Sequence, residues 1–367
     1  MTAVSEPILI STENGGQRVT VDRSLGTIRR LELSVDGRVL EPLHAAPWLD
    51  EPDVQVRSDL LPVEKRLSGD FFCAPFGASD LTDAPAHGWT ANSQWTQADQ
   101  APGAFRFTLD RTVMGAQITK RLQLSEDAPI LYQTHEIKGG DGGLTVAHHP
   151  MVDVSDGATF STSKKRAVIA PDQPLDAGRN RLAVGTVSSD LSAIPASDGG
   201  TVDLHRLPIA DRHEDFVTLV EARTSGLGWS AIVRSNDVIV ILKDAAVLPV
   251  TMLWHSNAGR DYAPWNGRHT GILGIEDGCA AGAAGHRAAL TSNAIADQGV
   301  PTALTLVDGH THTIRHAIAA FPRPSGWRRV ADVNLTGSTL TITGDDGDDV
   351  RWPFDPNFLE GATDGNG

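Results

Sequence analysis

The sequence predicts an all-β protein, folded as a large antiparallel β-sandwich, and three observations lead to this prediction. Alternating apolar and polar residues, the pattern of strands with one buried face, recur along most of the 367 residues. Turn signals rich in Gly, Asp and Pro separate these runs. Helical periodicity is confined to GHRAALTSNAIADQG (285–299), and there is no regular repeat of the kind a propeller requires. Two large packed sheets therefore fit best.

The strand-like runs follow one another along the chain. The first, QRVTVDRSLGTIRRLELSVDGRVLEPL, breaks at Gly26 and at Asp36-Gly37, a dipeptide typical of hairpin turns. The later runs are FRFTLDRTVMGAQITKRLQLS, PILYQTHEIKGGDGGLTVAHHPMVDV, FVTLVEARTSGLGWSAIVRS, DVIVILKD, PTALTLVDGHTHTIRHAIAAF and STLTITGDDGDDVRWPF. We expect a single domain over residues 1–367, in which 335–367 form a terminal hairpin and a disordered tail. Residues 168–181 and 193–200 read as long loops within this domain, although a domain boundary there is the alternative.

Charge and composition exclude several classes of partner. The formal charge of −15 repels polyanions, so nucleic acids and anionic membrane surfaces are poor partners. No run reaches the roughly 20 apolar residues that a membrane helix needs. The N-terminus lacks the basic and apolar regions of a signal peptide. Together with only two cysteines, Cys73 and Cys279, these features predict a cytoplasmic protein.

Tryptophan usage suggests a sugar ligand. The chain has eight tryptophans and only two tyrosines, and indole faces suit the apolar faces of sugar rings. Core packing is the alternative explanation for most of these tryptophans.

Four local motifs, in a fixed order, resemble the galactose mutarotase-like (aldose 1-epimerase) superfamily. They are GDFFCAPFG, PAHGW, HHPMV and GILGIED, and the closing segment SNAIADQGVPTALTLVDGHTHTIRHAI is similar to the family's last strand pair. The resemblance covers most of the chain and implies a large antiparallel β-sandwich. It also implies that Glu276 is the general base, that His149 is the general acid, and that His87 contacts the sugar near its ring oxygen.

The chain departs from the family pattern in three places. Met151 and Val152 stand where aromatic residues usually follow His-Pro, so one wall of the sugar pocket is expected to differ. Arg66 is the nearest candidate for the arginine that precedes the His-Gly motif. Asp211 and Asp215 both compete for the role of the sugar-binding aspartate, and Asp215 is preferred because it lies closest to the start of a strand.

The segment before the glutamate adds further candidates for substrate binding. LWHSNAGRDYAPWNGRHTGILGIED contains tryptophans and arginines in alternation, a combination that suits a polyhydroxylated ring or an acidic substituent on it. Trp254, which ends a strand, and Arg268 are the predicted contacts. A loop anchored by its own tryptophans is the alternative.

Adjacent histidines on a strand cannot both enter one pocket, because successive side chains point to opposite faces. His149 is preferred over His148 because the family motif places Pro directly after the acid. A carboxylate and a protonated histidine are sufficient to remove the proton of the anomeric hydroxyl and to protonate the ring oxygen. No cofactor is then needed.

Two other clusters favour structural interpretations. His310, His312 and His316 in GHTHTIRH could hold a metal, but we interpret them as part of an exposed strand. The acidic GDDGDD (344–349) lacks the pattern of a calcium loop and is interpreted as a solvated hairpin turn. No metal site is therefore predicted.

These observations predict an aldose 1-epimerase (mutarotase) that interconverts the α and β anomers of a monosaccharide by acid/base ring opening. One alternative is a carbon–oxygen lyase or hydrolase that acts on a modified sugar. The other is a non-catalytic carbohydrate-binding protein. We expect a monomer or a homodimer.

Overall fold

The all-β prediction is confirmed by the computed structural model, which describes residues 7–223 and 226–359. In these residues the long elements are all strands, and each α-helix is a single turn of four residues. The strands form two large antiparallel sheets and several smaller ones. Of the predicted terminal hairpin and disordered tail (335–367), residues 360–367 lie outside the described residues.

The first large sheet has eight strands and carries the candidate site. Its path, from edge to edge, is β15 (Val187–Ser188), β14 (Lys165–Ile169), β19 (His213–Glu221), β22 (Val250–Asn257), β23 (Ile272–Cys279), β11 (Val146–His148) and β5 (Phe72–Cys73), while β12 (Met151–Asp153) also pairs with β23. β19, β22 and β23 are buried on both faces, apart from half-buried Asn257 at the end of β22.

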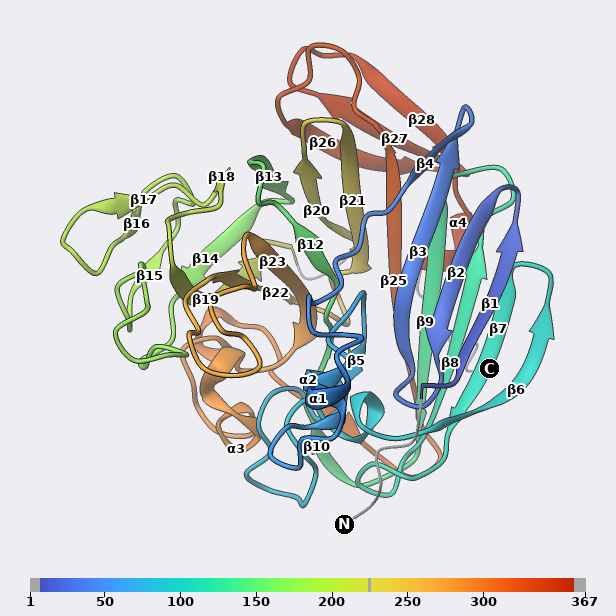
Figure 1. Cartoon of the computed structure of the whole chain (residues 1–367), viewed down its shortest axis with the longest axis horizontal. Coiled ribbons are helices and arrows are strands. Elements are labelled where there is room, and N and C mark those ends of the chain that lie inside the picture. Colours follow the sequence, from blue (N-terminus) through green and yellow to red (C-terminus); the bar gives the residue numbers. More distant parts are fainter. Residues whose placement is uncertain (1–6, 224–225, 360–367) are drawn as a thin grey trace.

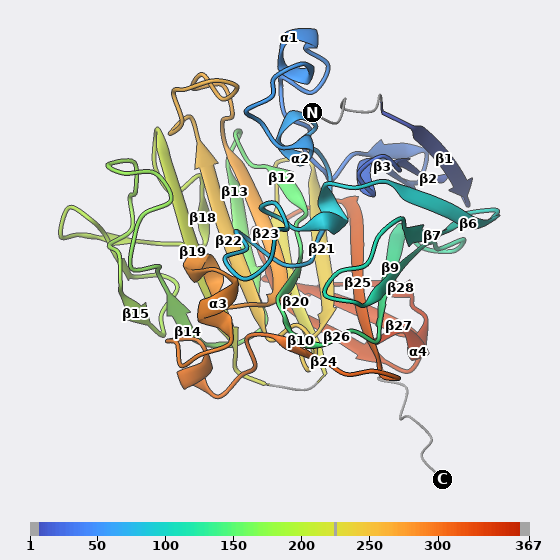
Figure 2. The same ribbon diagram turned by 90° about the horizontal axis from the view of Figure 1, so that it is seen from below.

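The second large sheet has nine strands. In order they are β18 (Arg206–Leu207), β13 (Ala158–Thr162), β20 (Leu227–Val233), β21 (Asp237–Asp244), β25 (Thr311–Pro322), β9 (Ile130–Lys138), β8 (Gln117–Leu124), β7 (Ala104–Leu109) and β6 (Trp95–Ala101). The two sheets pack as layers (Figure 2), with apolar side chains such as Leu253 and Ile275 from the first sheet and Ile239 and Ile318 from the second in one core.

Two smaller sheets flank the second large sheet (Figure 1). The N-terminal sheet consists of β1 (Leu9–Asn14), β2 (Gln17–Asp22), β3 (Thr27–Val35) and β4 (Arg38–Leu40). Its turns fall where the sequence predicts them, with Gly26, Asp36 and Gly37 all at positive φ. The C-terminal sheet consists of β26 (Val330–Thr336), β27 (Thr339–Gly344) and β28 (Asp349–Pro353). The predicted hairpin around GDDGDD is thus formed by β27 and β28, and β26 joins it as a third strand.

The remaining elements are short. They are β10 (Gly142–Leu144) paired with β24 (Leu304–Leu306), β16 (Ile194–Pro195) paired with β17 (Thr201–Val202), α1 (Pro52–Gln55), α2 (Pro62–Lys65), α3 (His286–Ala289), α4 (Pro356–Leu359), and the 3₁₀ turns η1 (Trp89–Ala91), η2 (Gly282–Ala284) and η3 (Ala296–Gln298). The segment 285–299 therefore forms two short turns, α3 and η3, rather than one helix. Asn293 starts the second turn by accepting the backbone N–H groups of Ile295 and Ala296.

A buried polar layer lies between the two large sheets. Lys243 from β21 makes ion pairs with Asp277 at 3.0 Å and with Glu221 at 3.1 Å, and both carboxylates come from the opposite sheet. His316 from β25 lies 3.2 Å from Asp277. The interpretation of His310, His312 and His316 as part of an exposed strand is correct only for His312, which is half-buried in β25; His310 lies in the exposed turn before this strand, and His316 is fully buried.

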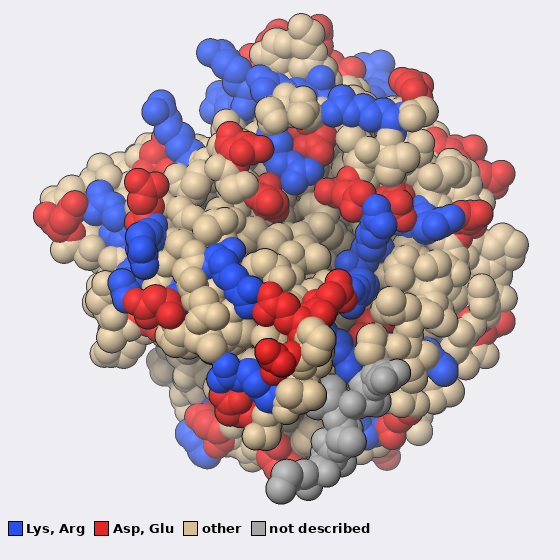
Figure 3. Space-filling model, viewed as in Figure 1, with Lys and Arg blue, Asp and Glu red and all other residues tan. Residues whose placement is uncertain are grey.

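The surface carries charges of both signs. Figure 3 shows Lys and Arg side chains interspersed with Asp and Glu side chains on the face seen in Figure 1. Among the described residues, no helix is long and apolar enough to cross a bilayer.

Candidate active site

A cavity of about 280 Å³ opens on the face of the eight-stranded sheet that points away from the nine-stranded sheet. Its floor is made of strand side chains, and its rim comes from α2, η2 and the loops around them. The cavity brings together residues that lie far apart in the sequence, including His87, His149, Trp254 and Glu276.

Strand alternation and register place the floor residues on one face. Phe216 in β19 pairs with Trp254 in β22, and Trp254 pairs with Gly274 in β23, two residues before Glu276. A Cβ atom at Gly274 would lie 3.2 Å from the Trp254 ring and 3.3 Å from Oε1 of Glu276. The glycine therefore leaves room for both side chains to turn into the cavity.

The central contact of the cavity is an ion pair. Nε2 of His149 lies 2.9 Å from Oε1 of Glu276, and both side chains are almost fully buried. Burial lowers the pKa of His149, but the charge and hydrogen bond of Glu276 outweigh it, so that the pKa lies above the usual 6.5. The Phe71 ring stacks on His149 with centroids 4.4 Å apart. The arrangement favours a protonated imidazole beside the carboxylate, the pairing that acid/base chemistry requires.

His149 reaches Glu276 because the chain bends between β11 and β12. The carbonyl oxygen of Pro150 accepts the N–H of Ile275 at 2.9 Å, which keeps this bend next to β23. The backbone N–H of His149 donates to Oδ1 of Asp70 at 2.9 Å.

His148 points to the opposite face of the sheet, between the two large sheets. Its Nδ1 lies 3.2 Å from Oδ2 of Asp70, and its ring stacks on His316 at 4.1 Å. Burial and the nearby His316 lower the pKa of His148 to about 4, which Asp70 only partly offsets. Of the two adjacent histidines, only His149 lines the cavity.

His87 lines the cavity wall beside His149, with ring centroids 5.5 Å apart. Burial, together with the charges of His149 and Arg260, lowers the pKa of His87 to about 3. The surroundings thus favour the charged form of His149 and the neutral form of His87.

Arg260, rather than Arg268 or Arg66, supplies the arginine of the cavity. Arg268 lies outside the lining, where it pairs with Glu51. Arg66 is buried elsewhere, and its guanidinium makes an ion pair with Asp22 at 3.0 Å. The sequence segment 253–277 contains Arg260, but nothing in its pattern distinguishes Arg260 from Arg268.

Two carboxylates that do not line the cavity, those of Asp176 and Glu214, hold Arg260 in place. Its Nε lies 2.8 Å from Oδ2 of Asp176 and 3.8 Å from Oε2 of Glu214, while its guanidinium lies over Trp265 at 4.5 Å. Glu214 also accepts hydrogen bonds from Nε1 of Trp254 at 3.0 Å and from Oγ of Ser256 at 2.6 Å. Burial raises the pKa of Glu214, and the charge of Arg260 partly offsets this rise.

Neither Asp215 nor Asp211 lines the cavity, and the carboxylate of this segment that contacts lining residues is that of Glu214. Asp215 points the other way, where it accepts the backbone N–H groups of Arg181 and Leu182 and pairs with His213 at 2.7 Å. Asp211 lies in an exposed turn. The sequence could have indicated Glu214, because it lies two residues before Phe216 on β19 and their side chains therefore point to the same face of the sheet.

The two residues that replace the family's aromatics, Met151 and Val152, are fully buried and do not line the cavity. Its aromatic wall instead comes from Phe76, Phe216, Trp254 and Trp265, as the lining residues show.

Asp70, His148 and His316 form the one group in the described part of the chain whose potential metal-ligand atoms lie within 4.8 Å of one another. The two imidazole planes are stacked with only 8° between them, so their nitrogen lone pairs run side by side rather than towards one point. Asp70 is also occupied by Gln133, whose Nε2 lies 2.6 Å away. We therefore assign this group to the buried polar layer.

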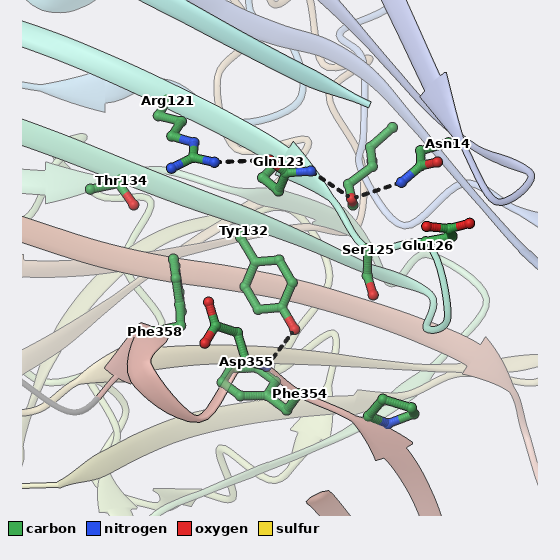
Figure 4. Close-up of a pocket in the computed structure, with 12 residues that line it drawn as sticks. Asn14, Arg121, Gln123, Ser125, Glu126, Tyr132, Thr134, Phe354, Asp355 and Phe358 are labelled. Atoms are coloured by element: carbon green, nitrogen blue, oxygen red, sulfur yellow. Dashed lines mark hydrogen bonds between the residues drawn. The ribbon is translucent and has the colours of Figure 1, made fainter. Parts of the chain in front are cut away.

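A larger hollow, of about 360 Å³, lies on the outer face of the nine-stranded sheet beside α4. Figure 4 shows its lining of polar and aromatic side chains, in which the hydroxyl of Tyr132 accepts the backbone N–H of Asp355 at 3.2 Å. Among the residues that line it there is no histidine, and so no acid/base pair of the kind found in the smaller cavity.

No protein-family model matches the sequence, and no match is found among curated proteins. Solved structures are nevertheless similar in fold. A candidate aldose 1-epimerase from Escherichia coli K12 has a TM-score of 0.60 at 12% identity, with 86% of this chain and 99% of that chain covered. A galactose mutarotase related enzyme from Lactobacillus acidophilus has a TM-score of 0.53 at 12% identity, with 86% and 97% covered. A galactose mutarotase-like protein from Lactobacillus casei has a TM-score of 0.52 at 13% identity, with 86% and 100% covered. The chain thus has the galactose mutarotase-like fold that its motifs imply.

The ion pair leads to a prediction about protonation. In Glu276→Gln the pKa of His149 should fall below 6.5, because burial still lowers it and the carboxylate charge that raised it is gone. NMR titration of the histidine ¹⁵N signals measures this change. The pKa of His148, which does not contact Glu276, serves as the internal control. An unchanged His149 pKa would show that the carboxylate does not set it.

The same shift predicts a pH dependence of stability. Since the folded-state pKa of His149 lies above 6.5, the pair stabilises the fold fully below about pH 6.5 and loses this contribution as the pH rises through the folded-state pKa.

Proposed function

We propose that this protein is an aldose 1-epimerase, which interconverts the α and β anomers of a monosaccharide. The observation that carries the proposal is the buried contact of 2.9 Å between His149 and Glu276, at the floor of a cavity with aromatic walls. A binding protein would have no need of a buried, mutually polarised acid and base, since burying charges is costly.

The geometry of the pair suits the reaction. The base and the acid must reach the anomeric hydroxyl oxygen and the ring oxygen, and both oxygens are bonded to the same carbon, C1. Glu276 accepts the proton of the anomeric hydroxyl while His149 donates its Nε2 proton to the ring oxygen, so that the bond between C1 and the ring oxygen breaks. Rotation about the bond between C1 and C2 turns the other face of the carbonyl to the hydroxyl. The two groups then exchange roles as the ring closes, and no proton is gained or lost overall.

The cavity also supports a small and uncharged substrate. Its volume of about 280 Å³ lies just below the usual range for ligand pockets, about 300–1,000 Å³, which favours a monosaccharide. The rings of Trp254 and Trp265 can pack on the apolar face of a sugar. Because Asp176 and Glu214 already balance the charge of Arg260, we expect its Nη groups to donate to sugar hydroxyls rather than to bind an acidic substituent.

We also propose a cytoplasmic location. Cys73 and Cys279 are both free and buried, which suits a reducing compartment.

The direct test is saturation transfer between the two anomeric proton signals of each sugar in a panel of aldoses. We expect the protein to accelerate exchange for at least one aldose, and Glu276→Gln to slow it by roughly a hundred- to ten-thousand-fold, because the general base is lost. Glu126→Gln, a similar change in the hollow of Figure 4, is the matched control and should leave exchange unchanged. Conversion to a new product would instead favour the lyase or hydrolase, and binding without exchange a carbohydrate-binding protein. Glu276→Gln activity within a few fold of the parent would contradict the assignment of the base.

A pair of arginine variants tests the assignment of the binding residues. Arg260→Met should weaken sugar affinity by roughly 10- to 150-fold, as expected for the loss of hydrogen bonds from a charged donor. Arg268→Met should leave affinity within about twofold, since Arg268 lies outside the lining. Isothermal titration with the sugar identified above gives both values. A larger loss in Arg268→Met than in Arg260→Met would reverse the assignment.

A further inference from the structure

His87 has one ring nitrogen bound to the protein and one that is free. Its Nδ1 lies 3.6 Å from Sγ of Cys73, whereas its Nε2 has no hydrogen-bond partner in residues 7–223 and 226–359. The backbone of His87 is in the left-handed region, with φ of +66°, an uncommon conformation for a residue with a side chain. Its ring is further confined by Phe71, which meets it edge-on at 5.5 Å.

We propose that Cys73 is a positioning residue, whose thiol donates a hydrogen bond to Nδ1 of His87 and so fixes the neutral tautomer that carries its proton on Nε2. His87 then acts as a hydrogen-bond donor towards the ligand in the cavity. The proposal rests on the proposed function in one respect only, which is that this ligand is a sugar.

The direction of the hydrogen bond follows from the environment of both groups. Burial raises the pKa of the Cys73 thiol, and the negative charges of Glu276 and Asp70 raise it further, so the sulfur keeps its proton. The neutral imidazole of His87 offers one lone pair and one N–H. A thiol that retains its proton can donate it to that lone pair, an arrangement in which the N–H lies on the other nitrogen.

The choice of tautomer matters because of what the cavity has to recognise. The ring oxygen of a pyranose has lone pairs but no proton, so only a donor can hydrogen-bond to it. With its proton on Nε2, His87 can donate to this oxygen or to a neighbouring hydroxyl oxygen. With its proton on Nδ1, His87 would turn a lone pair towards the ring oxygen and repel it.

Cys73 can hold this tautomer because it lies directly behind the wall of the cavity. It belongs to β5, where it pairs with Ala147 of β11, two residues before His149. Its side chain is fully buried. The pairing of β5 with β11 thus positions both His149, the proposed acid, and Cys73, which sets the hydrogen-bonding direction of His87.

The test compares Cys73→Ala, which removes the donor, with Cys73→Ser, which keeps one. Histidine ¹⁵N signals of the ligand-free proteins report the tautomer of His87, and isothermal titration reports sugar affinity. We expect His87 of the parent and of Cys73→Ser to carry the proton on Nε2. In Cys73→Ala a mixture of tautomers should appear, and affinity should fall about fivefold, the equivalent of one ordinary hydrogen bond. Cys279→Ala, another buried thiol that does not contact His87, is the matched control and should resemble the parent.

Two results would overturn the proposal. One is a parent protein whose His87 carries its proton on Nδ1. The other is identical behaviour of Cys73→Ala and Cys73→Ser in the tautomer signals. Because the tautomer is measured without sugar, a failure of anomer exchange with the expected tautomers intact would count against the proposed function alone.

Discussion

The buried ion pair between His149 and Glu276 is the contact on which the rest of the site depends. Each group offsets the cost of burying the other, because an unpaired charge at this depth would be strongly disfavoured. The pair also raises the pKa of His149, and the positive charge of protonated His149 in turn lowers the pKa of the neighbouring His87. Its geometry is set by the backbone, since Asp70 binds the N–H of His149 and Pro150 binds that of Ile275. The chemistry therefore rests on the pairing of β11, β12 and β23.

Alternation along the strands gives neighbouring residues of this sheet different roles. His149 and Glu276 face the cavity, whereas their neighbours His148 and Asp277 belong to the buried polar layer between the sheets. β19 repeats the pattern in part, since Glu214 supports the cavity and Asp215 ties down the loop at residues 181 and 182. A shift of one residue in the register of β23 would exchange the two sets of side chains. This explains how one sheet can serve as both structural core and floor of a site.

The sequence was sufficient to predict the features that depend on local patterns. Alternating hydrophobicity and Asp-Gly turns predict the sandwich, and the motifs around His87, His149 and Glu276 indicate residues that the structure places around one cavity. The preference for His149 over His148 follows from alternation together with the Pro that comes next. Trp254 lines the cavity because it pairs with Phe216, so that both side chains lie on the face of the sheet that forms the cavity floor.

The binding residues were harder to predict because they depend on contacts between distant segments. Arg260 reaches the cavity through its ion pair with Asp176, 84 residues earlier, and no local pattern encodes this contact. Arg66 was expected from its distance to the His-Gly motif, but the N-terminal sheet provides Asp22 as its partner. Asp215 was preferred for its closeness to a strand start, although parity along the strand is what decides which side chain faces the cavity. Long-range pairing and side-chain direction were thus the missing information.

The measurement that tests the central claim most directly is the pH dependence of kcat/KM for anomer exchange, set beside the pKa of His149 measured by NMR in the free protein. If protonated His149 is the acid, activity should fall on the alkaline side with an apparent pKa above 6.5 that matches the NMR value. A rate that stays constant while His149 loses its proton would contradict the account.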